Sequence, residues 1–440
     1  MMGRSTRQMH LVMVDLSDLI KDTHLLKKID KHINFDFIYE KAKPYYAERG
    51  RKSIDPVVMI KMLLIGYLYG IKSERRLEEE VSLNLAYRWF CGIELDEKIP
   101  DHSTFSQNRK RRFQDDAIFR EIFNEIVINC IKKGIVSGET LVSDGSFIPA
   151  NVAWTSKEEL IVTVERSAVS YLDILDEELS KLPGYQKPEC ITEEKKLVKS
   201  STDKDCGYIN HQTKKGLGYL TEMTVDTKNG IITGVDTYPA NHRESNIILR
   251  HLDRQMKDTG IQIKEIALDG GYDVGAVHRG LELLGINGYC SPREYHNNAL
   301  KKGFEYDPDQ DVFICAHGKK LSFERIVYKK PSSNYYRVYS LPRQECKCCN
   351  FRQHCSVDNG KCRITASSFY PSFFANQKRS ASTRYKDLKR LRSIWSEGTF
   401  SVLKREHKLG KAVKRGLCRI GEECLLAAMA LNLKRIVTAL

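Results

Sequence analysis

The segments that follow residue 138 come in an order that favours a mixed sheet. Two short apolar runs read as strands, and a longer stretch reads as two strands joined at Asn229-Gly230, a dipeptide typical of tight hairpin turns. Two further stretches read as helices. The order strand, hairpin, helix, strand, helix predicts an α/β fold in which helices flank a mixed sheet. The segments are, in chain order, 139–147, 216–239, 245–260, 263–269 and 274–286.

The first 135 residues read as helical. Asp55 and Pro56 form an N-cap and first-turn pair, and the apolar run behind them continues to Gly70. Apolar residues also recur at helical spacing from Phe119 to Cys130. We expect residues 1–135 to form an all-helical domain ahead of the sheet.

Two segments interrupt the predicted core and set the other domain boundaries. Residues 155–200 read as a charged helical insertion, and residues 301–375 as an aromatic, Cys-rich insertion with little helix. Helix then resumes toward the C-terminus. We expect residues 138–300 and 376–440 to form the core together.

Positive charge favours a polyanionic partner. The chain has 71 Lys and Arg against 57 Asp and Glu, and from residue 378 onward the balance is 16 against 5. A field of this sign favours DNA, RNA or an anionic membrane surface. An Arg-rich run near residue 110 could also present a helix to DNA, although a solvated helix face is the alternative. The candidate DNA-contact residues are Arg109, Arg111, Arg390, Arg392, Lys404, Lys408, Lys411, Lys414 and Arg415.

No segment has the character of a membrane span or a secretory signal. The longest apolar stretch, 57–70, is shorter than the roughly 18 residues that a span needs, and it contains Lys61. Asp15 and Asp18 interrupt the N-terminal segment where a signal needs an apolar core. We therefore expect a cytoplasmic protein without a membrane segment.

Three acidic residues stand out because each lies in a segment of distinct character. Asp144 and Asp269 end apolar runs, and Glu397 opens a basic stretch. Carboxylates held at strand ends and on a nearby helix can converge on a pair of divalent cations, which suits phosphoryl transfer on nucleic acid. Taken singly, each Asp-Gly pair is also compatible with an ordinary turn. Room for a phosphodiester is expected beside them at Gly145, Gly270 and Gly271.

The stretch from Arg384 onward reads as one helix that carries Glu397. Residues seven apart share a helix face, so Arg390, Glu397 and Lys404 should line up, with Lys408 one turn on. That arrangement puts a carboxylate among cations able to neutralise DNA phosphates. The face toward the core should consist of Leu388, Leu391, Trp395 and Val402.

Six cysteines fall between residues 315 and 362. Cys346 and Cys349 form a C-x-x-C knuckle, Cys355 follows, and Cys315 precedes them. Four thiolates of this kind suit a tetrahedral structural zinc. Free thiols are the alternative, and the competing ligands are Cys348, Cys362 and His354.

Together these motifs resemble the bacterial DDE insertion-sequence transposases with a ribonuclease H-like core, and most closely the IS eleven-eighty-two group. The resemblance covers nearly the whole chain. It rests on five ordered segments, RGRKSIDPVVMIKMLLIGYLYGIKSERRLEEEV through IPDHSTFSQNRKR, LVSDGSFIPAN, KGLGYLTEMTVDTKNGIITG, IALDGGYD and EGTFSVLKREHKLGKAVKRGL.

The resemblance implies the activity, the metal and the partners. It identifies Asp144, Asp269 and Glu397 as a triad for two Mg²⁺ (or Mn²⁺) ions, and Lys404 as the lysine that contacts DNA at the cut site. The implied reaction is metal-assisted in-line displacement, first at the inverted repeats of the element and then on double-stranded target DNA. A homodimer on DNA is also implied.

One departure from related families concerns the residues just before Glu397. Those families have Tyr and Arg seven and four residues ahead of the Glu, where this chain has Arg390 and Ser393. Arg392 or Arg390 is then expected to take the role of the arginine.

Two other functions fit part of the pattern. A non-catalytic DNA-binding regulator with a zinc module explains the charge and the cysteines, but not the three acidic residues. A metal-dependent nuclease without strand transfer shares the acidic site.

Overall fold

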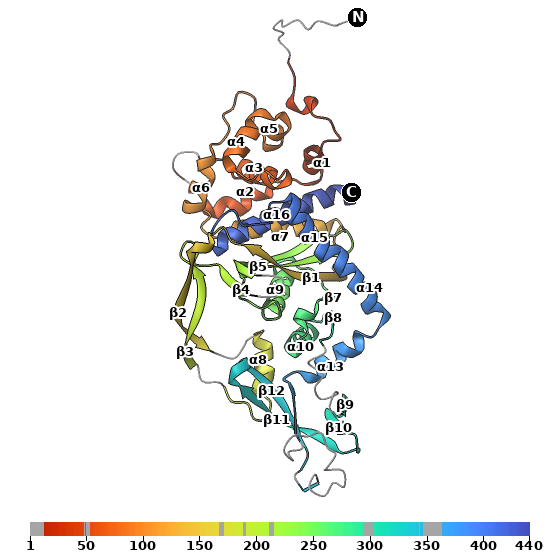
Figure 1. Ribbon diagram of the computed structural model, residues 1–440. Coiled ribbons are helices and arrows are strands. Elements are labelled where there is room, and N and C mark those ends of the chain that lie inside the picture. Colours follow the sequence, from red (N-terminus) through yellow and green to blue (C-terminus); the bar gives the residue numbers. More distant parts are fainter. Residues whose placement is uncertain are drawn as a thin grey trace, which may run out of the picture.

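The computed structural model describes residues 13–47, 49, 53–166, 171–187, 191–210, 215–293, 303–342, 344–345 and 363–440. Its helices and sheets form an elongated molecule, with the N-terminal helices at one end and a small sheet at the other (Figure 1). Within the described part of the chain, no helix is long and apolar enough to cross a membrane.

The N-terminal part is helical, as predicted. Asp55 caps α3, and its Oδ1 accepts a hydrogen bond from the Val57 amide at 2.7 Å. Because α3 is apolar on nearly every side, it lies buried among the other helices. The helices are α1 (Leu25–His32), α2 (Phe37–Ala42), α3 (Pro56–Leu68), α4 (Glu74–Leu83), α5 (Leu85–Cys91), α6 (His102–Arg111) and α7 (Ala117–Lys132).

A six-stranded mixed sheet forms the centre, which confirms the predicted α/β fold. The sheet has the order β4-β5-β1-β7-β8, and β6 pairs with β5 as well. β1 runs antiparallel to β5 and parallel to β7, and β8 continues parallel to β7. The strands are β1 (Thr140–Pro149), β4 (Gly207–Asn210), β5 (Lys215–Asp226), β6 (Ile232–Pro239), β7 (Glu265–Leu268) and β8 (Asn287–Cys290), with α9 (Glu244–Thr259) and α10 (Gly275–Leu283) between them.

The C-terminal helices return to the sheet and to the N-terminal helices. The long helix α16 packs against α1, α3, α7 and β6 (Figure 1). Buried side chains of the N-terminal helices, the sheet and α16 form one continuous cluster. The helical part therefore shares its core with the sheet. These elements are α13 (Tyr370–Arg379), α14 (Thr383–Arg392), a π-helical turn (Ser393–Glu397), α15 (Gly398–Glu406) and α16 (Leu417–Ala439).

The charged helix predicted within 155–200 is largely wrong. β2 (Lys157–Arg166) and β3 (Ile191–Ser200) pair along their full lengths as a two-stranded hairpin, and among the described residues between them α8 (Asp173–Ser180) is helical. Four consecutive β-branched residues, 161–164, explain the strand, because their restricted side-chain rotamers disfavour a helix. In Figure 1 this hairpin stands beside the central sheet.

The 301–375 insertion contains a second sheet. Its five antiparallel strands follow the order β13-β12-β11-β10-β9 around a small aromatic core that includes Tyr306, Phe313 and Tyr339. Among the residues of this segment that the structure describes, strands predominate up to Ser367. The strands are β9 (Phe304–Asp307), β10 (Val312–Cys315), β11 (Lys320–Lys329), β12 (Asn334–Ser340) and β13 (Arg363–Ser367).

Candidate active site

Strands β1 and β7 bring Asp144 and Asp269 together. Their parallel register pairs Val142 with Ala267. Asp144 lies two residues further along β1, and Asp269 directly follows β7 with an extended backbone. If the register and the alternation of side chains continue, the two are level and share the face of Val142 and Ala267. Asp144 does not end its strand, as the sequence suggested, since β1 continues to pair with β5 as far as Pro149.

A single guanidinium joins Asp144 to Glu397. Arg392 Nη1 lies 3.2 Å from Oδ2 of Asp144, and Arg392 Nη2 lies 3.1 Å from Oε1 of Glu397. The Ser393 hydroxyl also donates to Oε2 of Glu397, at 3.3 Å. The structure thus brings the helix carboxylate to the first strand carboxylate, although the two are far apart in sequence.

The π-helical turn explains why Arg392, and not Arg390, meets the carboxylates. A π turn closes at i to i+5, so Arg392 and Glu397 lie on one face. The extra residue shifts the seven-residue pattern that was expected to align Arg390 with Glu397, and the Arg390 side chain is exposed. Of the two arginines left open by the sequence, Arg392 is the one that contacts the carboxylates; the role of the family's arginine stays a prediction.

Trp395 fixes this turn against the hairpin between β5 and β6. Gly230, at the hairpin turn, has a φ of 72°, and a Cβ atom there would collide with the Trp395 ring. Arg435 lies 5.6 Å from the centroid of that ring and donates to Oγ1 of Thr399 at 2.8 Å. Leu388 is fully buried in the core. Leu391, Trp395 and Val402, which were also expected to face the core, are partly buried and pack against it.

A further carboxylate, which the sequence reading missed, lies close to Asp269 and to the backbone beside Asp144. Glu244 is the first residue of α9, and a Cβ atom at Gly145 would lie 2.5 Å from its Oε1. A Cβ atom at Gly271 would lie 3.0 Å from Oε2 of Glu244 and 2.7 Å from Oδ1 of Asp269. The space beside these glycines, expected to admit a phosphodiester, is therefore occupied by Glu244. Acidic residues are common in the first turn of helices, so the sequence offered no distinctive signal.

Beneath the site lies a fully buried acid, Glu222. Its carboxyl accepts hydrogen bonds from the hydroxyl of Ser143 at 2.6 Å and from that of Tyr272 at 2.7 Å. Burial raises the pKa of Glu222 well above its ordinary value, and the nearby carboxylates of Glu244 and Asp144 raise this pKa further. This network ties the turn after Asp269 to β5 and to the residue before Asp144.

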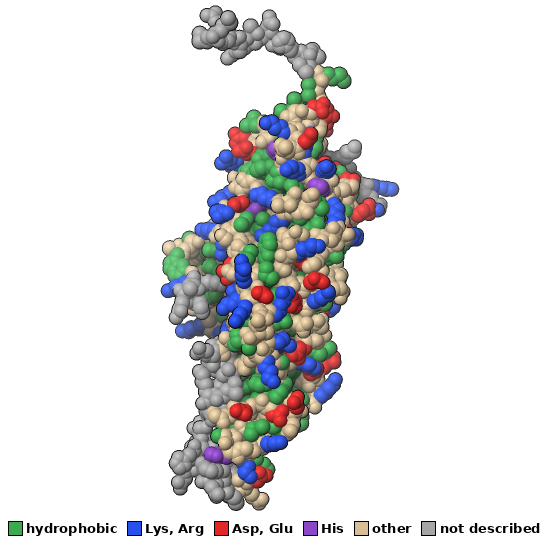
Figure 2. Space-filling model, turned by 90° about the vertical axis from the view of Figure 1, so that its right-hand side faces the viewer, with side chains coloured by type: hydrophobic (Ala, Val, Ile, Leu, Met, Phe, Trp, Pro, Cys, Tyr) green, Lys and Arg blue, Asp and Glu red, His purple; other side chains and the backbone are tan. Residues whose placement is uncertain are grey.

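Several predicted DNA-contact residues are exposed. Lys404 lies on α15, two turns after Glu397 and on the same side of that helix. In the view of Figure 2, Lys and Arg side chains are spread along the length of the molecule with Asp and Glu among them. The exposed candidates are Arg111, Arg390, Lys404, Lys411 and Arg415.

Three other candidates contact groups of the protein itself, and two of them, Arg109 and Lys408, join the helical part to the C-terminal segment. Arg109 is only 7% exposed, and its Nε donates to Oε1 of Glu422 at 2.9 Å. Lys414 Nζ lies 2.6 Å from the same oxygen. Lys408 Nζ lies 4.3 Å from the centroid of the Tyr67 ring, and burial lowers the pKa of Lys408 to about 8. These three cations are engaged with groups of the protein itself, and their role as DNA contacts stays a prediction.

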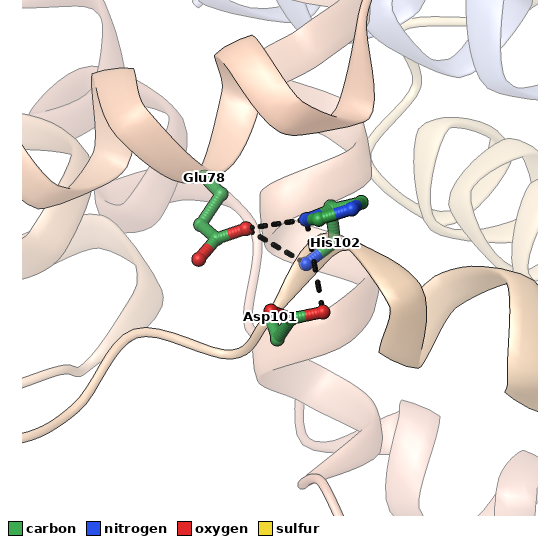
Figure 3. Close-up of side chains that lie close together, drawn as sticks. All are labelled: Glu78, Asp101 and His102. Atoms are coloured by element: carbon green, nitrogen blue, oxygen red, sulfur yellow. Dashed lines mark hydrogen bonds and ion pairs between the residues drawn. The ribbon is translucent and has the colours of Figure 1, made fainter.

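A second group of potential metal ligands, Glu78, Asp101 and His102, lies between α4 and α6 (Figure 3). Both Nδ1 and the backbone amide of His102 lie 2.9 Å from Oε2 of Glu78, and Arg75 donates to the other ring nitrogen. Asp101 Oδ1 accepts from the Ser103 amide at 2.7 Å. Protein hydrogen bonds already use these ligand atoms, so the group serves to cap α6 and join it to α4.

Of the four cysteines predicted to bind zinc, the structure describes Cys315. It ends β10, and its Sγ accepts a hydrogen bond from the Lys319 amide at 3.3 Å. The other three, Cys346, Cys349 and Cys355, lie outside the described residues.

Solved structures with some similarity to the chain are transposase complexes. They include the piggyBac transposase synaptic complex with hairpin DNA, which is 11% identical with a TM-score of 0.30 over 94% of this chain and 81% of that chain. The Mos1 mariner paired end complex with Mn is 11% identical with a TM-score of 0.17, over 58% and 67%. The Drosophila P element transposase strand transfer complex is 9% identical with a TM-score of 0.23, over 91% and 84%. TM-scores at this level do not establish a common fold. No curated protein matches the sequence significantly.

Two family models match the sequence itself. A transposase domain (DUF772) matches residues 14–111, and a transposase DDE domain matches residues 314–437. The second match includes Glu397 and Lys404, whereas Asp144 and Asp269 lie between the two matched regions. With a transposase domain matched toward each end, the chain belongs to the DDE-type insertion-sequence transposases, enzymes that cut and transfer DNA.

Proposed function

We propose that Asp144, Asp269 and Glu397 are the catalytic triad of an insertion-sequence transposase of the IS eleven-eighty-two group. The observation that carries the proposal is the convergence of the three segments. When the β1–β7 register is continued, the two aspartates are level, and Arg392 joins Asp144 to Glu397. The substrate is double-stranded DNA, first the terminal inverted repeats of the element and then the target.

The central sheet is proposed to be a ribonuclease H-like core. The sheet order supports this, because β1, β5 and β6 form an antiparallel set on one side of β1. The later strands β7 and β8 add in parallel on the other side. We retain the division into a helical DNA-binding part, 1–135, a core, 138–300 with 376–440, and an insertion, 301–375.

The donors of the site fit divalent cations such as Mg²⁺ or Mn²⁺, because they are carboxylate oxygens, which hard cations prefer. Asp144, Asp269 and Glu397 would hold these ions, which activate the attacking oxygen and stabilise the leaving oxygen in phosphoryl transfer. The residues of the chain supply the positioning. Arg392 fixes the distance between Asp144 and Glu397, and the network around buried Glu222 fixes the backbone of both aspartates.

The DNA-binding face is proposed to include the exposed cations around α14 and α15. Lys404 is suited to a phosphate near the cleaved bond, because it lies along the helix from Glu397. Each cation that contacts a phosphate makes affinity more sensitive to salt. Synapsis of two element ends is proposed to require a homodimer on DNA.

A structural zinc ion in the insertion is a second, independent proposal. The amide of Lys319 donates to Sγ of Cys315 in a tight turn, and an N–H donor of this kind stabilises a thiolate ligand. Cys346, Cys349 and Cys355 would complete the set. Elemental analysis should find one zinc per chain, lost when all four are changed to Ser; folded protein free of zinc would refute the site.

The proposed activity is tested with a labelled duplex that carries the terminal repeat, Mg²⁺ and unlabelled target DNA. The repeat is obtained from the DNA that flanks the gene. A transposase both cuts the duplex and joins it to target. Cuts without joined products would identify a nuclease, and binding without cuts would identify a regulator.

A further inference from the structure

Two glycines locate the Glu244 carboxylate relative to the proposed triad from independent directions. Its Oε1 and Cδ lie 2.5 and 2.9 Å from the position of a Cβ at Gly145, the residue directly after Asp144. Its Oε2 lies 3.0 Å from the position of a Cβ at Gly271, a point that Oδ1 of Asp269 approaches to 2.7 Å. The carboxylate therefore lies close to Asp269 and against the backbone of the residue that follows Asp144.

The sequence folds in a way that keeps Glu244 in this place. It begins α9, which packs on the 3-10 turn Gly270–Tyr272 and on β5. Any side chain at Gly145 or Gly271 would have to displace the Glu244 carboxylate. Because neither glycine has a side chain, both leave space for the Glu244 carboxylate.

Charge supports the same conclusion. Glu244 and Asp144 both raise the pKa of buried Glu222, and both raise that of Tyr272, so the two carboxylates act on the same small region. Like charges this close oppose one another unless cations lie among them. The described structure already brings Arg293 there, with its Nη2 3.6 Å from the same Cβ position at Gly271, and a divalent cation would be held by the same carboxylates. A role for Glu244 confined to the dipole of α9 requires only that it lie near the helix start, not that it turn toward Asp269.

We infer that Glu244 is a fourth acidic residue of the active site and binds, together with Asp269, one of the divalent cations. This inference rests on the proposed function. It adds a ligand from α9 to a site otherwise built from β1, the turn after β7 and the π-helical turn.

The test is a titration of the full-length protein with Mn²⁺ by calorimetry, without DNA, so that the readout is independent of cleavage. Glu244→Gln is expected to weaken Mn²⁺ binding by about tenfold or more, the scale typical of lost metal-site partners. The matched control is Asp253→Asn on the same helix, where Asp253 pairs with Lys257 at 2.7 Å. Asp253 lies about 14 Å along the helix from Glu244. The Asp253→Asn variant should therefore leave the affinity for Mn²⁺ unchanged.

Asp269→Asn in the same titration separates the inference from the proposed function. Weakened binding in Asp269→Asn with unchanged binding in Glu244→Gln would overturn the role of Glu244 and leave the triad in place. Unchanged binding in both variants would overturn both assignments.

Gly145→Ala provides a second route, which matters if Glu244→Gln folds poorly. The new methyl group should push the Glu244 carboxylate aside, because the obstruction is the flexible end of a side chain. Mn²⁺ binding should weaken in Gly145→Ala alone and should not weaken further when Gly145→Ala is added to Glu244→Gln. Independent, additive losses in the double variant would contradict the inference.

Discussion

At the scale of single residues, neighbours of the same type have unrelated roles. Arg109 and Arg111 belong to one basic run, and the sequence around them gives no reason to expect different roles. Arg109 is buried against Glu422 on α16, which is more than 300 residues away, whereas Arg111 is exposed. Sequence could identify the run as basic, but the partner that decides the role of each arginine is set by tertiary packing.

Arg109→Met should lower the free energy of unfolding by about 3 kcal/mol, because it breaks a buried ion pair and leaves carboxylates short of a partner. Arg111→Met is the control; it should change stability by no more than about 0.5 kcal/mol, as exposed substitutions usually do. Chemical denaturation measures both. Unchanged stability in Arg109→Met, with weakened DNA binding, would support Arg109 as a DNA contact.

Tertiary packing also limited what the sequence could predict about the proposed site. Asp144 and Asp269 could be identified as candidates, since each ends or interrupts an apolar strand beside glycine, and so could Glu397 among its cations. Glu244 could not, because an acidic residue in the first turn of a helix is ordinary. Only the positions of Gly145 and Gly271 reveal where its carboxylate lies.

At the scale of elements, the spacing of apolar residues predicted most helices and strands. The prediction failed where the residue types of a segment favoured a different structure. The hairpin of β5 and β6 followed from Asn229-Gly230, and α3 from its cap and apolar run. The helix predicted across β2 was wrong because charged residues suggested a helix while a β-branched run favoured a strand. The π-helical turn Ser393–Glu397 could not be predicted from the sequence. Trp395 in this turn packs against the distant hairpin at Gly230, and a tertiary contact of this kind leaves no local pattern.

Gly230→Ala should therefore disturb the active site through an element that contains none of the triad. The residue has a φ of 72°, and its new methyl group would displace Trp395. We expect a lower melting temperature and slower DNA cleavage. Gly260→Ala is the matched control, because Gly260 has a φ of 70° and no atom within 4 Å of its Cβ position.

Gly260→Ala should cost only the backbone strain, of about 1 kcal/mol, and should leave cleavage unchanged. Equal losses of stability with normal cleavage in both variants would mean that Trp395 does not position the π-helical turn.

At the scale of the whole molecule, the C-terminal helix packs against the N-terminal helices. Helix α16 packs against α1, α3 and α7 of the helical part and against β6 of the sheet, so it joins the two parts of the core (Figure 1). Apolar patterning could predict that α16 is buried, but not against which elements, because contacts between distant segments leave no periodic trace. The helical part and the sheet should accordingly move as one body when DNA binds.

The central claim is that three segments far apart in the chain form one metal-dependent catalytic site. Its most direct test compares wild type with Asp144→Asn, Asp269→Asn and Glu397→Gln for Mg²⁺-dependent cleavage of the labelled terminal duplex, with DNA binding measured on the same preparations. We predict that each variant loses cleavage and still binds the duplex. Near-normal cleavage by either aspartate variant would contradict the assignment.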